Sequence, residues 1–78
     1  LEKQTISISI TKDIQFYINE KPIAESAIEQ ELKLLISNEQ EPAIILHTDK
    51  SVAIEHVVKV MDIAYRNKYK IVLATKPN

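Results

Sequence analysis

Two short, continuous apolar runs flank a long amphipathic stretch in the second half of the chain, and this pattern limits the fold more than any other feature. The runs are Ala43–Leu46 and Lys70–Thr75. Runs without alternation are typical of central strands that are covered on both faces. Between them, residues 52–68 place apolar side chains at helical spacing. Two strands joined by such a helix form a right-handed crossover, so the pattern predicts two parallel strands.

The predicted helix over residues 52–68 has a broad apolar stripe, which we expect to pack on the sheet. Basic residues gather in its C-terminal half, where they suit the helix dipole. The stripe consists of Ile54, Val57, Val58, Met61, Ala64 and Tyr65.

The first part of the chain predicts an antiparallel hairpin. Thr5–Thr11 alternates isoleucine with serine or threonine, which is the period of a strand with one buried face. Lys12–Asp13 predicts a turn, and residues 14–19 alternate again. Pro22 limits whatever follows to a short edge piece. The inward positions of the second alternating run are Ile14, Phe16 and Ile18.

A capping box predicts where the first helix begins. Ser26 stands three residues before Glu29, so each side chain can bond to the other's backbone amide. We expect a helix from Ser26 to Ser37, ended by the polar stretch that follows. Its apolar stripe is Ile28, Leu32, Leu35 and Ile36.

These elements predict one domain over residues 1–78, because a chain of 78 residues has room for a single core. The predicted fold is α/β of an α+β-like kind: a mixed sheet of four to five strands (hairpin, helix, strand, helix, strand) with two helices on one face. The uncovered face then carries an apolar strip, which is typical of an interaction surface. Either Ile45 and Val72 or, in the opposite register, Ile44 and Leu73 form that strip.

Composition excludes several classes of function. The chain has no cysteine, which excludes disulfides and thiol catalysis, and no glycine, which excludes phosphate-binding glycine loops. The net charge of −1 gives no strong field for nucleic acid. Residues 1–41 carry eight acidic and four basic side chains, and residues 42–78 carry three acidic and six basic ones. This split indicates either an acidic and a basic side or simply solvated helix faces.

Catalytic and metal chemistry find little support. The paired carboxylates Glu25 and Glu29 fit solvated surface charge, and no Ser, His and Asp form a triad motif, so we predict no enzyme. We also predict no cofactor and no metal, because the one group of suitable ligands lacks tight spacing. That group is His47, Asp49, Glu55 and His56.

Two further interpretations concern charge. His47 and His56 titrate in the range of a pH sensor, although ordinary surface histidines do so too. Nucleic-acid binding is not predicted, because the basic residues of the last third have no aromatic platform beside them. Those residues are Lys59, Arg66, Lys68, Lys70 and Lys76.

The second half resembles the periplasmic domain of the ExbD/TolR biopolymer-transport family. The segments that carry the resemblance are residues 45–52 (Ile-Leu-His-Thr-Asp-Lys-Ser-Val), 57–62 (Val-Val-Lys-Val-Met-Asp) and 71–75 (Ile-Val-Leu-Ala-Thr). The first half is similar through Tyr17-Ile18-Asn19 and Pro22-Ile23. The resemblance extends from about Thr5 to Pro77.

The chain departs from the family pattern only in its turns. The family often has glycine in the first hairpin turn and after the second helix, where this chain has Ile14 and Asn67-Lys68-Tyr69. It also often has proline at the start of the second helix, near Ala53 of this chain. We expect Asn67 to take the left-handed cap that glycine supplies elsewhere.

The resemblance implies a non-enzymatic interaction domain of a proton-motive-force-driven complex in the Gram-negative inner membrane, of TonB–ExbB–ExbD or Tol–Pal type. It implies a homodimer, a TonB- or TolA-like energy transducer as partner, and peptidoglycan as a partner in TolR-like members. An ExbB- or TolQ-like membrane partner would be engaged through an N-terminal transmembrane helix, which we expect to lie outside this chain because it begins at Leu1 without Met. The proton-coupling Asp belongs to that helix, so neither Asp49 nor Asp62 takes its role.

The final strand is the predicted partner-binding element, through strand addition at an exposed sheet edge. Leu73 is as compatible with a place in the core as with a contact. Asp49 and Val52 are expected to shape the adjoining turn. A small-ligand regulatory domain of ferredoxin-like or ACT type is the alternative, although the chain starts with a hairpin and lacks a glycine turn. The predicted contact residues are Ile71, Leu73 and Thr75.

Overall fold

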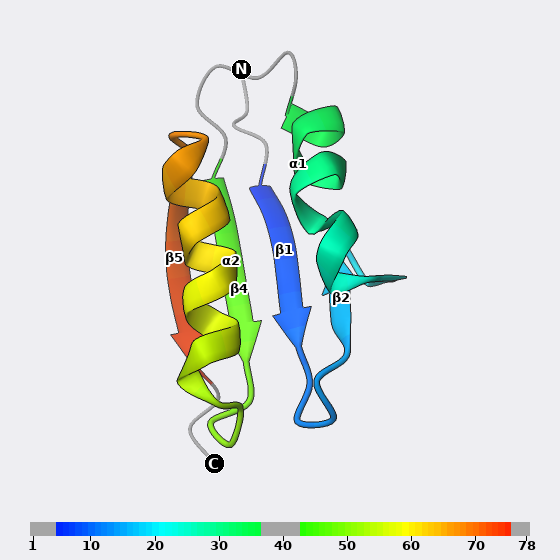
Figure 1. Ribbon diagram of the computed structural model, residues 1–78, viewed down its shortest axis with the longest axis vertical. Coiled ribbons are helices and arrows are strands. Elements are labelled where there is room, and N and C mark those ends of the chain that lie inside the picture. The colour runs from blue at the N-terminus through cyan, green and yellow to red at the C-terminus, as the bar shows by residue number, and fades with distance from the viewer. Residues whose placement is uncertain (1–4, 37–42, 76–78) are drawn as a thin grey trace.

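A computed structural model describes residues 5–36 and 43–75 of the chain. It contains a five-stranded sheet in the order β3-β2-β1-β4-β5 (Figure 1). The strands are β1 Thr5–Ile10, β2 Phe16–Ile18, β3 Lys21–Ile23, β4 Ala43–Thr48 and β5 Lys70–Thr75. The helices are α1 Ile28–Ile36, which follows a 3-10 turn over Glu25–Ala27, and α2 Ile54–Arg66. The predicted α+β class with a mixed sheet is confirmed. The predicted helix end at Ser37 and the residues Lys76 and Pro77 lie outside the described ranges.

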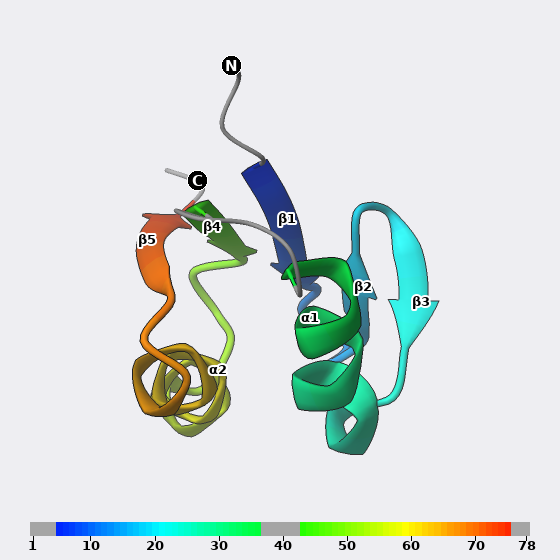
Figure 2. The same ribbon diagram turned by 90° about the horizontal axis from the view of Figure 1, so that it is seen from above.

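The sheet is mixed, which means that it contains both antiparallel and parallel strand pairs. β1 pairs antiparallel with β2, and β2 pairs antiparallel with β3. β1 and β5 flank β4 and are both parallel to it. Both helices cover the same face of the sheet, α1 beside β1 and β2 and α2 beside β4 and β5 (Figure 2). The predicted crossover and the placement of both helices on one face are confirmed.

The core lies between this face of the sheet and the two helices. Alternate strand residues point into it, so β1 reads as exposed or half-buried residues interleaved with three buried isoleucines. Full burial of each such side chain stabilises the fold by about 1.5–3 kcal/mol before entropy is counted. The fully buried large side chains are Ile6, Ile8, Ile28, Leu32, Ile44, Leu46 and Val60.

No described helix lies over the opposite face of the sheet, and this face carries the predicted apolar strip. Ile45 pairs in register with Val72, which is 62% exposed, whereas Ile44 is buried on the helix side. Leu73 pairs with buried Leu46 and therefore also lies on the helix side. Of the two registers left open by the sequence, the first is correct.

The apolar stripe of α2 is wider than the surface it covers. Ile54, Val58 and Tyr65 were predicted to pack on the sheet, but they are 70%, 54% and 64% exposed. Val60, which was not predicted, is buried instead. The reason is that α2 lies beside the last strand, so the sheet ends beneath it and can cover only part of the apolar arc.

The turn between β1 and β2 differs from the sequence prediction at Ile14. Ile14 has a φ of 60° and sits in a turn closed by hydrogen bonds between Thr11 and Gln15 and between Ile14 and Thr11. Strand β2 therefore begins at Phe16, two residues later than predicted. Ile14 nevertheless packs partly against the core. The backbone there has the left-handed form that explains a family preference for glycine.

The start of α1 also differs. Ser26 lies within the 3-10 turn Glu25–Ala27, and the residue before that turn, Ala24, makes no side-chain capping bond. Glu29 does not reach back to Ser26; its carboxylate contacts α2 instead. The predicted capping box is therefore wrong, because a tertiary partner for Glu29 replaces the local one.

Helix α2 ends in a Schellman motif with a lysine in the left-handed position. The amide of Tyr69 donates to the carbonyl of Ala64, and the amide of Lys68 donates to that of Tyr65. Lys68 has a φ of 62°, whereas Asn67 has a φ of −100°. The prediction that Asn67 takes the left-handed cap is wrong by one residue.

Candidate functional site

Among the strands that the structure describes, β5 pairs with β4 alone and so forms one edge of the sheet. An edge strand presents unpaired backbone N–H and C=O groups to solvent. Ile71 and Leu73 lie opposite Ile44 and Leu46 on the helix side, with Leu73 still 40% exposed. Thr75 pairs with Thr48 at the end of the strand. The three predicted contact residues thus lie along one edge, and their role in partner binding stays a prediction.

An exposed apolar surface, here called the α2 flank, lies beside this edge. It consists of Ile54, Val58 and Tyr65, which share one side of the helix by their spacing. The side toward α1 carries Lys59 and Arg66, which pair with acids of the first helical segment. The flank therefore faces away from α1, toward the β5 edge.

Sequence reasoning missed the α2 flank because it placed Ile54, Val58 and Tyr65 in the stripe that packs on the sheet. A signal was nevertheless present: eight apolar residues over residues 54–65 exceed what one packed face requires. Together, the free strand edge and the α2 flank offer backbone hydrogen bonds and apolar contact at the same place.

The turn between β4 and α2 is ordered by Asp49. Its Oδ1 accepts hydrogen bonds from the Ser51 amide at 2.9 Å and the Ser51 hydroxyl at 2.6 Å. The Ser51 hydroxyl and amide, followed by the nearby charge of Lys12, hold the pKa of Asp49 below its ordinary value. The amide of Val52 donates to the Asp49 carbonyl at 3.0 Å. Asp49 and Val52 therefore form this turn, and their contact with a partner stays a prediction.

The opposite edge of the sheet, strand β3, is closed to strand addition. Asn19 and Glu20 have φ values of 50° and 72° between the paired residues Ile18 and Lys21, as in a two-residue type I′ hairpin. The pair that flanks such a turn is hydrogen-bonded, so the next residue, Pro22, directs its backbone outward. Proline has no N–H to offer there. The two edges are thus unequal, with β5 open and β3 blocked.

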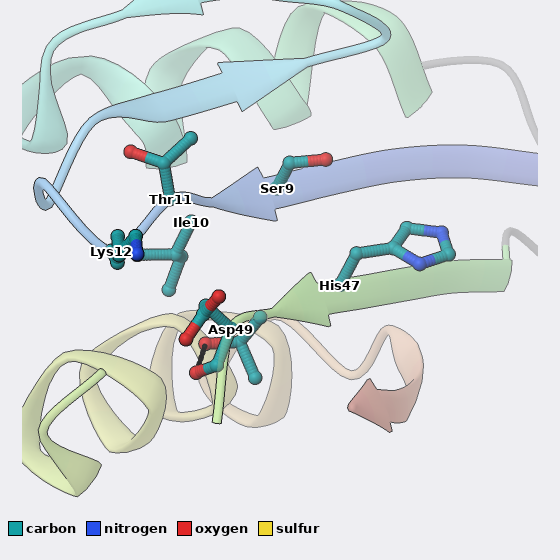
Figure 3. A pocket seen from close by; sticks show the side chains of 7 residues that line it. Ser9, Ile10, Thr11, Lys12, His47 and Asp49 are labelled. Atoms are coloured by element: carbon teal, nitrogen blue, oxygen red, sulfur yellow. Dashed lines mark hydrogen bonds between the residues drawn. The ribbon is translucent and has the colours of Figure 1, made fainter. Parts of the chain in front are cut away.

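A polar hollow of about 270 Å³ lies at the carboxyl ends of β1 and β4 (Figure 3). Lys12 and Asp49 lie toward the strand ends, and Ser9 and His47 lie further back along the strands. Ser9 and His47 are register partners on the uncovered face. The hollow is lined by Ser9, Ile10, Thr11, Lys12, His47, Thr48 and Asp49.

The four residues weighed as metal ligands are split between two places. His47 lies on the uncovered face of β4, whereas His56 lies at the start of α2 with its ring 6.3 Å from that of Phe16. The His56 Nε2 atom is 3.9 Å from Glu55 Oε2, and its Nδ1 atom is buried without a hydrogen bond. Across residues 5–36 and 43–75, no three His, Asp or Glu side chains are grouped to hold a metal ion.

The paired carboxylates of the first helical segment connect the two helices. Glu29 Oε2 accepts from Asn67 Nδ2 at 2.9 Å, and Glu29 Oε1 lies 3.5 Å from Arg66 Nη2. Glu25 Oε2 lies 3.8 Å from Lys59 Nζ. The bond from Asn67, followed by the Arg66 charge, lowers the pKa of Glu29. The interpretation of Glu25 and Glu29 as merely solvated charge is therefore wrong.

In the described part of the chain, no helix has the length and apolar character needed to cross a membrane. A family model described as biopolymer transport protein ExbD/TolR matches residues 1–78. No curated protein matches the chain. Members of this family are not enzymes; they are associated with the bacterial inner membrane and take part in TonB and Tol complexes with ExbB or TolQ. Because the match spans the full sequence, the chain belongs to the ExbD/TolR family of biopolymer transport proteins.

Proposed function

We propose that residues 1–78 are the periplasmic domain of a proton-motive-force-driven energy-transducing complex, and that the domain binds its partners by strand addition at β5. The energy transducer would be of TonB or TolA type, and a second copy of the domain would make a homodimer. Peptidoglycan is a further partner in a TolR-like system. The observation that carries the proposal is the open β5 edge beside the α2 flank.

The strand edge and the helix flank supply different parts of the binding energy. An extended partner segment on β5 gains backbone hydrogen bonds, which are independent of its sequence. Every second side chain of that segment then points to the helix side of the sheet, toward Leu73 and the α2 flank. Apolar side chains at those positions are buried, and they provide the specificity. The partner segment we expect is therefore extended and apolar at alternate positions.

The same surface serves a second copy of the domain. Two β5 strands that meet antiparallel about a two-fold axis join their sheets and bring their α2 flanks face to face. A strand edge pairs with one strand at a time, so the second copy and the transducer segment compete for it. We therefore expect the transducer segment to shift the domain from dimer toward monomeric complex.

An NMR titration of the isotope-labelled domain with the periplasmic segment of the transducer from the same organism tests this proposal. The expected shifts fall on Ile71–Thr75, on the Asp49–Val52 turn and on the α2 flank. An absence of shifts at about millimolar peptide, where even weak interface contacts are visible, contradicts the proposal.

Variants separate partner contact from folding. Val58→Lys places a charge in the α2 flank and Leu73→Lys places one on the β5 edge. Both wild-type side chains are already 40% exposed or more. We expect each variant to fold and to bind the transducer segment about tenfold or more weakly, because the charge is desolvated in the complex. The control is Gln30→Lys, which adds the same charge on an exposed position of α1. If Leu73→Lys unfolds while Val58→Lys binds normally, Leu73 is a core residue and the site is wrong.

The alternative, a ferredoxin-like small-ligand domain, is weakened by the fold. A ferredoxin-like domain has the element order βαββαβ. This chain begins with three strands before its first helix. The polar hollow at the ends of β1 and β4 is the one observation that favours ligand binding.

A further inference from the structure

The polar hollow at the carboxyl ends of β1 and β4 lies where the chain direction changes across the sheet. From β1 the chain goes to β2 on one side, and from β4 it goes through α2 to β5 on the other. In open sheets with parallel strands, the crevice outside the carboxyl ends at such a switch point is the usual place for a ligand. β1 and β4 are parallel neighbours with their carboxyl ends together, so this chain has that arrangement.

The polar groups of the hollow are largely unused by the fold. Both hydrogen bonds from Ser51 go to Asp49 Oδ1, which leaves Oδ2 without a hydrogen bond among the described residues. Within the same ranges, the side chains of Ser9, Lys12 and His47 also make no hydrogen bond to the protein. A small set of convergent polar groups in a concave site is what orients a bound small molecule.

The charges of the hollow define the kind of ligand. Lys12 and Asp49 are close enough for the lysine charge to favour the ionised carboxylate. A simple anion would be attracted by Lys12 but repelled by Asp49, and a simple cation would meet the reverse. A molecule that carries both charges satisfies both side chains at once.

We propose that this hollow binds a small zwitterion of the α-amino-acid class. The ligand carboxylate lies on the Lys12 ammonium and its ammonium on Asp49 Oδ2, with Ser9 and His47 available to a polar side chain. The volume of about 270 Å³ is large enough to admit a molecule of this size. This site shares Asp49 with the turn beside β5, but it uses neither the β5 edge nor the α2 flank, and it does not depend on the proposed function.

An NMR titration with glycine and L-alanine as probes tests this proposal. The single-charge probes acetate and methylamine, at matched ionic strength, are the comparison. We expect saturable shifts at Ser9–Lys12 and His47–Ser51 with both zwitterions, and weaker binding of each single-charge probe. Because the hollow is open to solvent, the expected Kd is about millimolar. Equal binding of acetate and glycine, or no saturation by glycine, overturns the proposal.

Matched variants assign the two charges. Lys12→Met removes the ammonium, and Asp49→Asn removes the carboxylate charge while keeping an Oδ1 acceptor for Ser51. Each variant is expected to weaken zwitterion binding about two- to fivefold, as for the loss of a solvent-screened charge pair. The controls Lys21→Met and Asp13→Asn change exposed charges that do not line the hollow. Unchanged affinity in both Lys12→Met and Asp49→Asn overturns the assignment.

The two proposals fail independently. Leu73→Lys and Val58→Lys change the β5 edge and the α2 flank, and they are expected to bind glycine with unchanged affinity. Loss of glycine binding in these folded variants contradicts a separate site at the hollow.

Discussion

The left-handed backbone positions of this chain are occupied by residues with side chains, because the chain contains no glycine. Within residues 5–36 and 43–75, four residues have positive φ: Ile14, Asn19, Glu20 and Lys68. The left-handed region costs a side-chain-bearing residue about 1–2 kcal/mol, and asparagine tolerates it best. Glu20 stands at the second central position of a type I′ turn, where glycine is usual. Lys68 stands at the helix-end position where glycine is also usual.

We expect Glu20→Gly and Lys68→Gly to raise the free energy of unfolding by about 0.5–1 kcal/mol each. Relief of the left-handed strain outweighs the added freedom of the unfolded chain, and both side chains are exposed, so no packing is lost. Urea denaturation of each variant measures the change.

The control for these variants is Gln30→Gly, at an exposed position inside α1. There the same substitution is expected to destabilise the domain by about 1 kcal/mol, because glycine is a poor helix residue. If Lys68→Gly lowers the free energy of unfolding as Gln30→Gly does, the assignment of a left-handed conformation to Lys68 is wrong.

At the scale of the elements, the two helices are joined by polar contacts as well as by the core. Asn67, just after α2, donates to both Glu29 and the Ile63 carbonyl, so it connects the end of one helix to the start of the other. Arg66 bridges Glu29 and Asp62. These contacts set how α2 lies against α1, and hence how the α2 flank faces the β5 edge.

We expect this helix connection to make stability depend on pH. The pKa of Glu29 is lowered in the folded state by the bond from Asn67 and by Arg66. The contribution is therefore fully present above the ordinary glutamate pKa of about 4.3, and it is lost as pH falls through the lower folded pKa. Glu29→Gln removes the titrating group, so the variant should lose less stability than the parent between about pH 5 and pH 3.

Urea unfolding of Glu29→Gln and the parent protein at a series of pH values measures this difference. Glu31→Gln, on the same helix, is the control and should leave the pH dependence of unfolding unchanged. Parallel curves for the parent protein and Glu29→Gln would contradict the proposed coupling.

Much of the fold could be predicted from the sequence, because short-range periodicity decides which strand face is buried. The alternation in β1 predicted its buried face correctly, and the two runs joined by a helical stretch predicted the parallel crossover correctly. The same runs were typical of central strands covered on both faces, and this was wrong: β5 is an edge strand, and Val72 is exposed on the uncovered face. The exposed α2 flank could not be predicted, because exposure there depends on where the sheet ends, and that is a property of strand order. The predicted capping box of Ser26 and Glu29 was wrong for a related reason: Glu29 binds a distant residue, Asn67, in place of its local partner. The hollow brings Lys12 and Asp49 together across two paired strands, and no local pattern shows this.

At the scale of the whole molecule, the sheet has one edge open to pairing and one edge closed. Pro22 closes β3, so pairing through β5 yields a finite assembly rather than a continuing stack of sheets. A domain with two open edges could add copies without limit. In the proposed function, the blocked β3 edge leaves β5 as the one edge of the described sheet that is open to a partner strand.

We expect Pro22→Val to increase self-association. The substitution gives β3 an outward N–H and a β-branched side chain, which together open the second edge. Sedimentation velocity over a range of protein concentrations is the measurement, with species larger than a dimer as the expected result. Lys21→Val is the control, since it adds an apolar side chain on the same strand without an outward N–H. Equal association of the two variants would show that apolarity alone is responsible.

The parallel direction of β1, β4 and β5 has a mechanical consequence. Thr5, at the start of β1, and Thr75, at the end of β5, lie at opposite ends of the sheet. A pull that enters at Thr5 and leaves through a strand paired along β5 acts along the strand axes. All ladder hydrogen bonds between the loaded strands then resist in shear at the same time, instead of opening one by one as in peeling. In the proposed complex, a longitudinal force would therefore pass between β1 and the bound partner strand without unzipping the sheet.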